Sequence, residues 1–270
     1  MIGIVYSKLD VVGANMASRI IETHELEKIE DHKYLRYETD ELRIYEVDVL
    51  PFMADFADEF GCDALVFLSR HKSEAAVDAF TTHSLGNWRG SADFGGKPKQ
   101  LSWAASSLML AVLKRISAID KQVEKTFEAT HHGPLLKTPC LFAESGGSDS
   151  MIESSAAAAL VADATMGAIT DAIDGDAIPQ KTAIGIGSNH YPEKFSGLAL
   201  SKGYAFTHIM PKYAILNEDG TDNLDVLAQT LERSDIEPET AVIDWKSLNA
   251  TMKEQTIKKL NEIGLDNEKV

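Results

Sequence analysis

The chain has few cysteines, and its two cysteines do not form a recognisable pair. Cys62 and Cys140 each lie in an apolar context, "EFGCDALVFL" and "TPCLFAE". This argues against a disulfide framework and against a zinc site built from paired cysteines. Any metal ion would therefore have histidine and carboxylate ligands.

Long apolar runs are also missing, since none approaches the ~18 to 20 residues that span a bilayer. The opening residues, "MIGIVYSKLD", form a strand pattern and lack the basic and apolar regions of a signal peptide. We therefore expect a cytoplasmic protein with no membrane partner.

Positive charge is scarce. The chain has 26 lysines and arginines against 42 aspartates and glutamates, which gives a formal net charge of −16. Indiscriminate binding of polyanions is disfavoured, because it requires many cationic side chains that displace counterions. A local basic patch can still hold a nucleic acid. The segment "NWRGSADFGGKPKQ", with Arg89, Lys97 and Lys99, is one candidate, and a solvated surface is the alternative.

Apolar segments of strand length and helix length alternate along the chain. This predicts an α/β protein with a mixed, mostly parallel sheet flanked by helices. With 270 residues and no repeat or linker, we expect a single domain over residues 1–270. Strands are expected at residues 2–7, 33–48 (as a hairpin), 63–69, 125–131, 139–145, 182–187, 204–210 and 240–245. Helices are expected at about residues 10–22, 50–61, 101–119, 149–172, 223–233 and 248–263.

Histidines gather where the predicted strands end. In α/β sheets, active sites tend to lie at strand ends. One histidine in such a place is more often structural, but six of them across one predicted sheet are hard to explain by packing. The six are His71, His83, His131, His132, His190 and His208.

Two of these histidines are adjacent, in the stretch "EATHHGPLLKTPCLFAESGGSDS". Neighbouring residues of a strand face opposite sides, so His131 and His132 make more sense where the strand breaks into a loop. If the strands on either side of "GPLLKT" pair as a hairpin, Glu144 returns near Glu128. A carboxylate beside imidazoles suits a metal site or an acid/base pair, and a surface ion pair near a turn is the alternative.

Glycines precede the helix expected from residue 149. Gly146 and Gly147 leave backbone N–H groups free at its start, which is a natural seat for a phosphate or a carboxylate. Ser150 and Glu153 are spaced as a capping box. "GIGSNHYP" is a second glycine-containing strand end, and neither segment continues into the Gly-Lys-Ser/Thr of a nucleotide-binding loop.

The longest irregular stretch is "THSLGNWRGSADFGGKPKQLSWA". A loop of this length in a compact domain is usually functional or disordered. Its Asn87, Trp88 and Lys97 favour function through stacking or phosphate contact. The chain has no Gly-x-Ser-x-Gly elbow and no His-Glu-x-x-His helix, so a covalent serine mechanism is unsupported.

Together, several segments resemble the archaeal-type D-aminoacyl-tRNA deacylase family. They are "YSKLDVVGANM", "VFLSRHKSE", "TTHSLGNW", "GGKPK", "EATHHGP", "GIGSNHYPEKF" and "HIMPKYAI". Ser188 and Asn189 depart from the glycine-rich run expected before "HY". The resemblance implies hydrolysis of the ester that joins a D-amino acid to the 3′ end of tRNA, with a zinc cofactor. It also implies a monomer whose fold is similar to peptidyl-tRNA hydrolases and nucleoside phosphorylases.

Under this interpretation, zinc activates a water molecule that attacks the ester carbonyl. The metal ligands are expected among His71, His83, His132 and Glu144, with His131 a further candidate. The catalytic residues are expected to be His131, His132, Glu128 and His190. The substrate-binding residues are expected to be Asn87, Trp88, Lys97, Lys99, Lys212, Gly146 and Gly147.

Other functions stay open at this point. Hydrolysis without a metal could use the ribose hydroxyl of the tRNA, with histidines that only position the terminal adenosine. A metal-dependent peptidase or amidohydrolase of similar fold would act on small substrates. A tRNA 3′-end binding protein would use the histidines structurally and would not turn over an ester.

Overall fold

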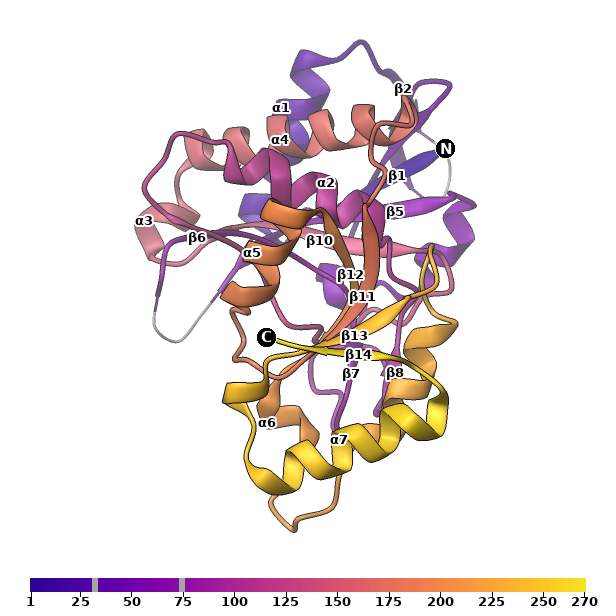
Figure 1. Cartoon of the computed structure of the whole chain (residues 1–270). Coiled ribbons are helices and arrows are strands. Elements are labelled where there is room, and N and C mark those ends of the chain that lie inside the picture. Colours follow the sequence, from indigo (N-terminus) through magenta and orange to yellow (C-terminus); the bar gives the residue numbers. More distant parts are fainter. Residues whose placement is uncertain (31–33, 73–75) are drawn as a thin grey trace.

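A computed structural model describes residues 1–30, 34–72 and 76–270, and it contains two main β-sheets (Figure 1). The larger sheet has eight strands in the order β2-β3-β4-β1-β5-β10-β6-β9. Its strands are β1 (Ile2–Ser7), β2 (Glu27–Glu30), β3 (Leu35–Glu38), β4 (Leu42–Val47), β5 (Ala64–His71), β6 (Ala79–His83), β9 (Glu124–Phe127) and β10 (Cys140–Gly146).

The smaller sheet has four parallel strands in the order β12-β11-β13-β14. They are β11 (Lys181–Ile186), β12 (Tyr204–Met210), β13 (Thr240–Ile243) and β14 (Asn267–Lys269). A two-stranded ribbon is formed by β7 (Gly86–Asn87) and β8 (Gln100–Leu101). The predicted fold class is therefore confirmed, but the expectation of one continuous sheet is wrong, because the C-terminal strands pair only with one another.

Helices cover the sheets on defined faces (Figure 1). The α-helices are α1 (Val11–Thr23), α2 (Ser106–Ser117), α3 (Asp149–Ile152), α4 (Ser155–Ile173), α5 (Glu193–Lys202), α6 (Lys212–Ile215) and α7 (Ala250–Ile263). The 3₁₀-helices are η1 (Pro51–Met53), η2 (Asp55–Phe60), η3 (Leu224–Leu231) and η4 (Trp245–Ser247). In Figure 1, α1, α2 and α4 lie on one side of the large sheet, and α7 lies at the opposite end of the molecule below the small sheet.

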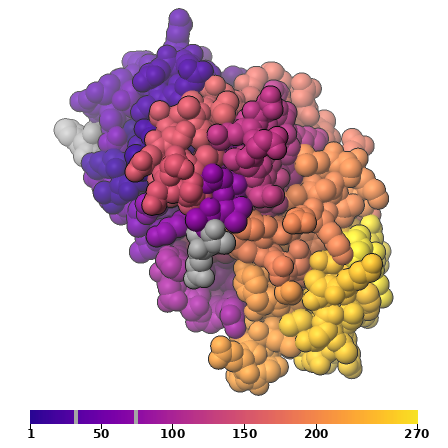
Figure 2. Space-filling model, turned by 90° about the vertical axis from the view of Figure 1, so that its left-hand side faces the viewer, coloured from indigo at the N-terminus to yellow at the C-terminus, as the bar shows by residue number. Residues whose placement is uncertain are grey.

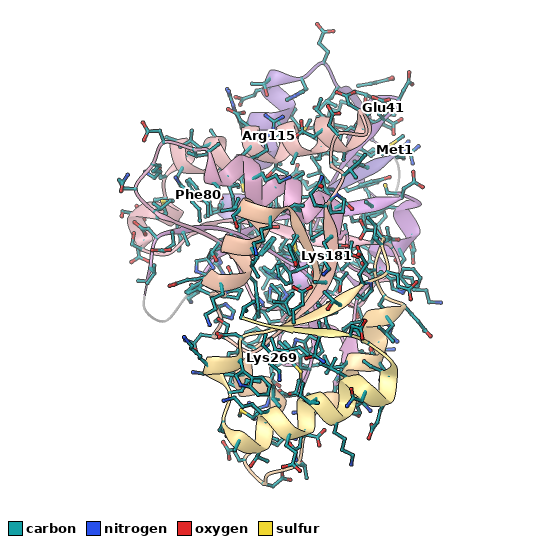
Figure 3. All side chains as sticks on the ribbon, viewed as in Figure 1. Met1, Glu41, Phe80, Arg115, Lys181 and Lys269 are labelled. Atoms are coloured by element: carbon teal, nitrogen blue, oxygen red, sulfur yellow. The ribbon has the colours of Figure 1, made fainter. Side chains whose placement is uncertain are left out.

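The central strand β5 shows why a continuous apolar run was needed. Val66 and Leu68 pack with α1, α2 and α4 in the main core, whereas Leu65 and Phe67 face the 3₁₀-helices η1 and η2 on the other side. Strands buried on both faces cannot alternate with polar residues. Side chains also fill the region between the two sheets (Figure 3), and α5, β11 and β12 contribute residues to the main core.

Several predicted elements differ from the structure in their pairing or extent. β9 and β10 do not form the expected hairpin, because β6 lies between them. The segment at residues 50–61 forms two 3₁₀-helices that end at Gly61, which has the expected left-handed conformation with φ of 63°. Residues 224–231 are also 3₁₀-helical. The antiparallel hairpin of β3 and β4 is confirmed, although residue 33 lies outside the described residues.

The helix expected at residues 149–172 is two helices. The hydroxyl of Ser148 accepts from Met151 N–H and begins α3, and Ser154 accepts from Ala157 N–H and begins α4. The predicted capping box at Ser150 is therefore wrong, because the side chain that caps the helix is two residues earlier.

Helix α4 also corrects the statement that long apolar runs are missing. By length and composition its 19 residues could cross a membrane. In the structure it packs against α1 and α2, with Val161, Ala162 and Ile169 buried in the main core.

Figure 2 shows one face of the molecule, with the N-terminal residues in indigo at the upper left and the C-terminal residues in yellow at the lower right.

Gly146 provides a test of how tightly β10 and β5 pack. A Cβ atom at this position would lie 2.0 Å from the carbonyl oxygen of His71. We expect Gly146→Ala to destabilise the protein by about 1–3 kcal/mol or more, because the backbone of β5 must move. A Cβ atom added at Gly197 in α5 would meet no described atom within 4 Å apart from the local backbone of its own helix, so Gly197→Ala should stabilise the protein by about 0.4–1 kcal/mol. Urea unfolding monitored by circular dichroism measures both, and equal stability of Gly146→Ala and wild type would contradict the prediction.

Candidate active site

Adjacent strands of the large sheet and one loop of the small sheet supply a polar cluster. His71 is the last residue of β5, and His83 is the last residue of β6. Glu144 lies within β10, and Glu128 directly follows β9. His190 comes from the loop after β11, and its carbonyl group accepts a backbone hydrogen bond from the segment after β9. The cluster therefore lies where the two sheets meet.

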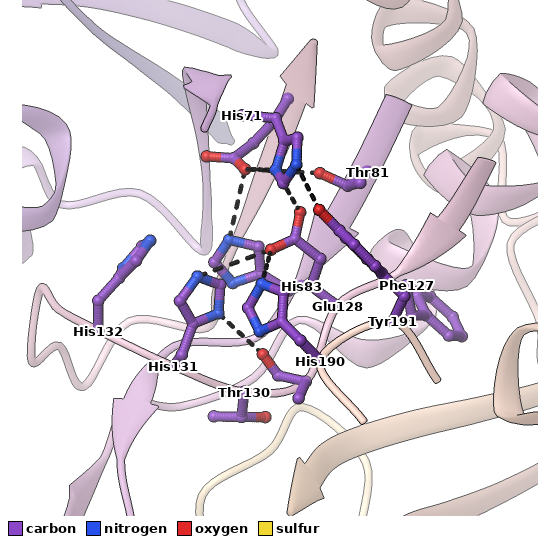
Figure 4. A network of polar contacts seen from close by, with 12 residues as sticks. His71, Thr81, His83, Phe127, Glu128, Thr130, His131, His132, His190 and Tyr191 are labelled. Carbon is purple, nitrogen blue, oxygen red and sulfur yellow. Dashed lines mark hydrogen bonds and ion pairs between the residues drawn. The ribbon is translucent and has the colours of Figure 1, made fainter. Parts of the chain in front are cut away.

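Glu128 is the centre of this cluster (Figure 4). Its Oε1 atom lies 2.9 Å from Nδ1 of His71, and its Oε2 atom lies 2.8 Å from Nε2 of His190. Nε2 of His131 is 3.7 Å from the same Oε2 atom. The residue is only 2% exposed, so these imidazoles replace the water that a free carboxylate would bind.

The pair of His71 and Glu128 is held in its charged form. Burial alone would favour the neutral imidazole, but Glu128 and Glu144 raise the pKa of His71 to about 11. Burial also works against a charged carboxylate, yet His190 and His71 hold the pKa of Glu128 well below its usual value. The second ring nitrogen of His71, Nε2, lies 2.6 Å from the hydroxyl of Tyr191. Both nitrogens of His71 are thus occupied.

Glu144 has a different electrostatic state from Glu128. Burial and the neighbouring charge of Glu128 raise its pKa. Its Oε2 atom lies 3.7 Å from Nδ1 of His71 and 3.9 Å from Nε2 of His83, and the hydroxyl of Thr81 donates to it at 3.4 Å. Two carboxylates that share one imidazole thus have their pKa values pushed apart, as in other acid/base sites.

Three further imidazoles lie together, and we call them the imidazole triad: His83, His131 and His132. In each, Nδ1 lies within hydrogen-bonding distance of a backbone carbonyl: that of residue 84 at 3.1 Å, residue 129 at 2.8 Å and residue 133 at 2.7 Å. Burial lowers the pKa of His131 well below its usual value and that of His132 to about 3. If Nδ1 donates in each ring, the lone pair of each Nε2 atom is left free.

The backbone at His132 explains how two adjacent histidines serve one site. Its φ angle of 47° is unusual for a residue with a side chain. Because of this turn, the rings of His131 and His132 lie with centroids 4.3 Å apart, and each also lies beside His83, at 4.2 and 5.0 Å. A regular strand would direct them to opposite faces.

The imidazole triad fits a metal ion. Its three candidate ligand atoms lie within 4.8 Å of one another. Nε2 of His83 is buried without a hydrogen-bond partner among the described residues. Neutral imidazoles whose other nitrogen donates to a carbonyl are the usual form of histidine ligands. Among the described residues, two other groups also have candidate ligand atoms within 4.8 Å of one another. One is Glu128, His131 and His190, and the other is His71, Glu128 and Glu144.

Two cavities meet at this cluster. The main cavity, of about 530 Å³, is lined by Asp10, Leu50, Pro51, Phe52, Ser69, Arg70, His71, Lys72, Phe94, Glu128, His131, His132 and Glu144. The side pocket, of about 130 Å³, is lined by Gly86, Asn87, Trp88, Arg89, Ser91, Thr130, His131, His132, Pro211, Tyr213 and Ala214. His131 and His132 are the residues common to both.

The structure brings most of the predicted catalytic and metal-binding residues together. His208 is the exception among the strand-end histidines. It lies within β12, is 1% exposed, and its Nε2 atom is 3.1 Å from the carbonyl oxygen of Arg233. Burial lowers its pKa to about 4. The simpler structural interpretation therefore fits this residue.

The predicted substrate-binding residues fall into two groups. Asn87 and Trp88 line the side pocket, although the indole N–H of Trp88 donates to the carbonyl of Thr130 and the ring is 4% exposed. Trp88 is thus a buried hydrogen-bond donor to the residue that precedes His131. Lys97, Lys99 and Lys212 line neither cavity, and Lys99 pairs with the carboxylate of Asp225 at 3.3 Å.

Gly146 and Gly147 are required by close packing. Both are buried against the backbone of neighbouring segments and line neither cavity. The N–H group and the hydroxyl of Ser148 donate to the carboxylate of Asp78 at 2.9 and 2.7 Å. A side chain of the protein therefore already occupies the position expected for an anionic ligand.

Two tyrosines of the site were missed from the sequence. The hydroxyl of Tyr191 lies beside His71, and that of Tyr213 lies 3.3 Å from Nδ1 of His190. Tyr191 directly follows His190 in "SNHYPEKF", and Tyr213 lies two residues after Pro211 in "MPKYAI". Their position near those residues was the available signal. Part of the segment "VFLSRHKSE" (residues 73 and 74) lies outside the described residues.

The His71–Glu128 pair predicts a specific pH dependence of stability. Glu128→Gln removes a buried counter-ion, and we expect a loss of about 3–5 kcal/mol at neutral pH. In the wild type, folded His71 keeps its proton up to about pH 11, whereas the unfolded chain releases it near pH 6.5. Stability should therefore fall as pH rises between these values, and Glu128→Gln should lack this contribution.

Urea unfolding in the presence of a chelator, at neutral pH and near the upper end of this range, measures the difference. Glu254→Gln, at an exposed position of α7, is the control and should behave as the wild type. A wild type and a Glu128→Gln variant with parallel pH profiles would disprove the charged pair.

Known proteins are similar to this chain over most of its length. The sequence profile of the family described as D-aminoacyl-tRNA deacylase matches residues 58–268. The D-aminoacyl-tRNA deacylase of Ignicoccus hospitalis is 36% identical over 205 residues, which cover 76% of this chain and 80% of that protein. The D-aminoacyl-tRNA deacylase of Desulfurococcus amylolyticus is 34% identical over 257 residues, or 91% of each chain.

A solved crystal structure of a conserved protein of unknown function has the same fold. It superposes with a TM-score of 0.88 at 27% sequence identity, covering 100% of this chain and 95% of that chain. The profile match spans more than half of the sequence, and the relatives match over most of their length. This chain belongs to the D-aminoacyl-tRNA deacylase family.

Proposed function

We propose that this chain hydrolyses the ester bond of D-aminoacyl-tRNA and releases free tRNA and a D-amino acid. The observation that carries the proposal is the buried His/Glu cluster at the junction of two cavities, in a chain of this family. Ester hydrolysis needs an activated water, stabilisation of the carbonyl oxygen and a proton for the leaving ribose oxygen. The cluster contains groups suited to each task.

His190 and Glu128 are the acid/base pair in this proposal. The carboxylate of Glu128 lies 2.8 Å from Nε2 of His190 and orients the imidazole. The Nδ1 atom of His190 lies 3.3 Å from the hydroxyl of Tyr213, and the side chain is 35% exposed, so a water molecule can approach the ring from solvent. The pair takes a proton from the attacking water and returns it to the ribose oxygen as the ester bond breaks.

His71 supplies positive charge next to the ester. Its imidazolium is fixed by Glu128 on one side and Tyr191 on the other, and it lines the main cavity. A fixed charge in a site with little water stabilises the oxygen that becomes negative during attack.

Zinc is the proposed cofactor, held by the imidazole triad. When bound, it supplies Lewis-acid chemistry to the ester and the water. This assignment keeps His83 and His132 among the expected ligands and adds His131. His71 and Glu144 are placed beside the metal, because both nitrogens of His71 already have partners.

The chain is proposed to work as a single domain over residues 1–270. Support comes from the site itself, since Glu128 of the large sheet and His190 of the small sheet are in direct contact. The expected monomeric state and cytoplasmic location stay predictions.

The proposed activity is tested with matched D- and L-tyrosyl-tRNA. We expect the wild type to hydrolyse the D ester selectively, and His132→Ala to lower kcat/KM by about 10²–10⁴-fold, the range for loss of one positioned catalytic group. His24→Ala, at an exposed position after α1, is the control and should retain activity. Release of radiolabelled tyrosine measures the rates.

Other results would favour the remaining alternatives. Tight tRNA binding without turnover by a folded wild type would support a tRNA 3′-end binding protein. Hydrolysis of free peptides without RNA would support a peptidase or amidohydrolase. D-selective hydrolysis that persists in a chelator would support the mechanism in which the ribose hydroxyl assists and no metal takes part.

The zinc assignment is tested by binding of the metal alone. We expect chelator-stripped protein to bind one zinc ion, with heat release and a raised melting temperature. His83→Ala and His131→Ala should weaken binding by at least about 10-fold, whereas His71→Gln should bind within about threefold of wild type. Isothermal titration calorimetry gives the affinities. The opposite ranking, with His71→Gln losing zinc and His83→Ala keeping it, would contradict this assignment and favour His71 and Glu144, two of the four ligands expected from the sequence.

A further inference from the structure

The two cavities share His131 and His132, and their walls are chemically different. We propose that they divide the substrate, so that the main cavity takes the D-aminoacyl group and the side pocket takes the 3′-terminal nucleotide of the tRNA. In this arrangement the base lies against Tyr213 and its phosphate lies near Arg89. This inference rests on the proposed deacylase function and adds to it the direction in which the substrate lies.

The main cavity suits a side chain that varies in size. Its outer wall is largely apolar and includes Leu50, Phe52 and Phe94, with the two aromatic rings 5.9 Å apart at their centroids. A volume of about 530 Å³ leaves room for side chains from small to aromatic. An apolar cavity distinguishes only weakly between side chains of different size, so one cavity of this kind can bind many of them.

The inner wall of the main cavity suits the ammonium group of an amino acid. Glu128 and Glu144 are each at most 4% exposed there, and His71 is the one buried cation of this wall among the described residues. Asp10 is also buried in this wall, where its carboxylate accepts from Val12 N–H and Gly13 N–H as the N-cap of α1. A cationic ammonium group is attracted by such a wall, and a phosphate is repelled. The other cations of the lining, Arg70 and Lys72, are exposed and lie at the rim.

The side pocket has the features of a nucleotide site. Tyr213 lines it with 46% of its surface exposed, which leaves part of an aromatic side chain available for a base. Arg89 lines the same pocket and has no ion-pair partner among the described residues. Among the residues that line this pocket, Arg89 is the one lysine or arginine, and none is an aspartate or a glutamate. The pocket therefore offers a cation without a competing carboxylate in its lining, on a protein whose net charge is −16.

The reacting bond fits the junction. The ester joins the ribose of the terminal nucleotide to the aminoacyl group, so it must lie where the two sites meet. His131 and His132 form this junction. His190 lines neither cavity but lies directly beside His131, with the two ring centroids 4.7 Å apart. The proposed catalytic groups are therefore next to the bond that breaks.

The first arm of the test changes the size of the main cavity. Leu50→Trp fills part of it, and kcat/KM is measured for D-tyrosyl-tRNA and D-alanyl-tRNA. We expect a loss of at least about 10-fold for the tyrosyl ester relative to the alanyl ester, because only the larger side chain meets the new ring. Leu200→Trp, at an exposed position of α5, is the matched control and should leave both rates unchanged. Circular dichroism and the melting temperature confirm that each variant folds.

The second arm changes the side pocket and uses the same two esters. Arg89→Gln and Tyr213→Ala should each raise KM by about 10-fold for both esters equally, because the terminal nucleotide is common to them. Arg89→Gln should also reduce the salt dependence of log KM by a slope of about 0.7, as expected for one lost phosphate contact. Tyr213→Phe keeps the ring and should raise KM less than Tyr213→Ala does, while it removes the hydroxyl that lies beside His190.

The two arms together separate the possible results. Equal losses for both esters in Leu50→Trp, or no loss for either, would overturn the assignment of the main cavity. Unequal effects of Arg89→Gln on the two esters, or an unchanged KM, would overturn the assignment of the side pocket. A wild type that hydrolyses neither ester would instead refute the proposed function itself.

Discussion

The buried carboxylate of Glu128 is the constraint on which the site depends. A charge that is 2% exposed is strongly destabilising unless ionic partners and hydrogen bonds replace its hydration. Those partners come from distant parts of the chain: His71 from β5 of the large sheet, and His190 from the loop after β11 of the small sheet. The correct apposition of the two sheets is therefore coupled to the formation of the site. A fold that placed the small sheet elsewhere would leave Glu128 partly unpaired in an apolar interior.

This coupling explains what could and could not be predicted from the sequence. The gathering of histidines at predicted strand ends indicated that His71, His83, His131 and His190 lie together, and the structure brings them into one cluster, because this expectation depends only on local strand boundaries. The predicted hairpin that would bring Glu144 next to Glu128 was wrong. The two residues meet through His71, since β6 separates their strands. Strand order is set by packing between residues far apart in sequence, and the spacing of apolar residues contains little information about it.

Prediction from local sequence also failed where the same residue pattern is compatible with several conformations. The apolar run of β5 gave a reliable strand, because a double-sided core permits few other structures. Residues 50–61 have helical spacing but form two 3₁₀-helices, which spacing alone does not distinguish from an α-helix. Gly146 and Gly147 resembled an anion-binding turn. Their actual requirement is the close approach of neighbouring backbone, and the carboxylate of Asp78 already binds Ser148. A pair of glycines indicates only which backbone conformations are allowed at that position. The neighbouring side chains determine whether a ligand can bind there.

The unusual backbone at His132 links the fold to the chemistry. A non-glycine residue at φ of 47° is a strained state that persists only where its surroundings determine it. Here the ring of His132 lies beside those of His83 and His131 and is also near Phe142, at 4.9 Å between centroids. Relaxation of this residue to an extended conformation would turn one of the two adjacent rings away. It would thereby remove a wall that both cavities share. The strained backbone at His132 is thus required for one pair of imidazoles, His131 and His132, to line both cavities.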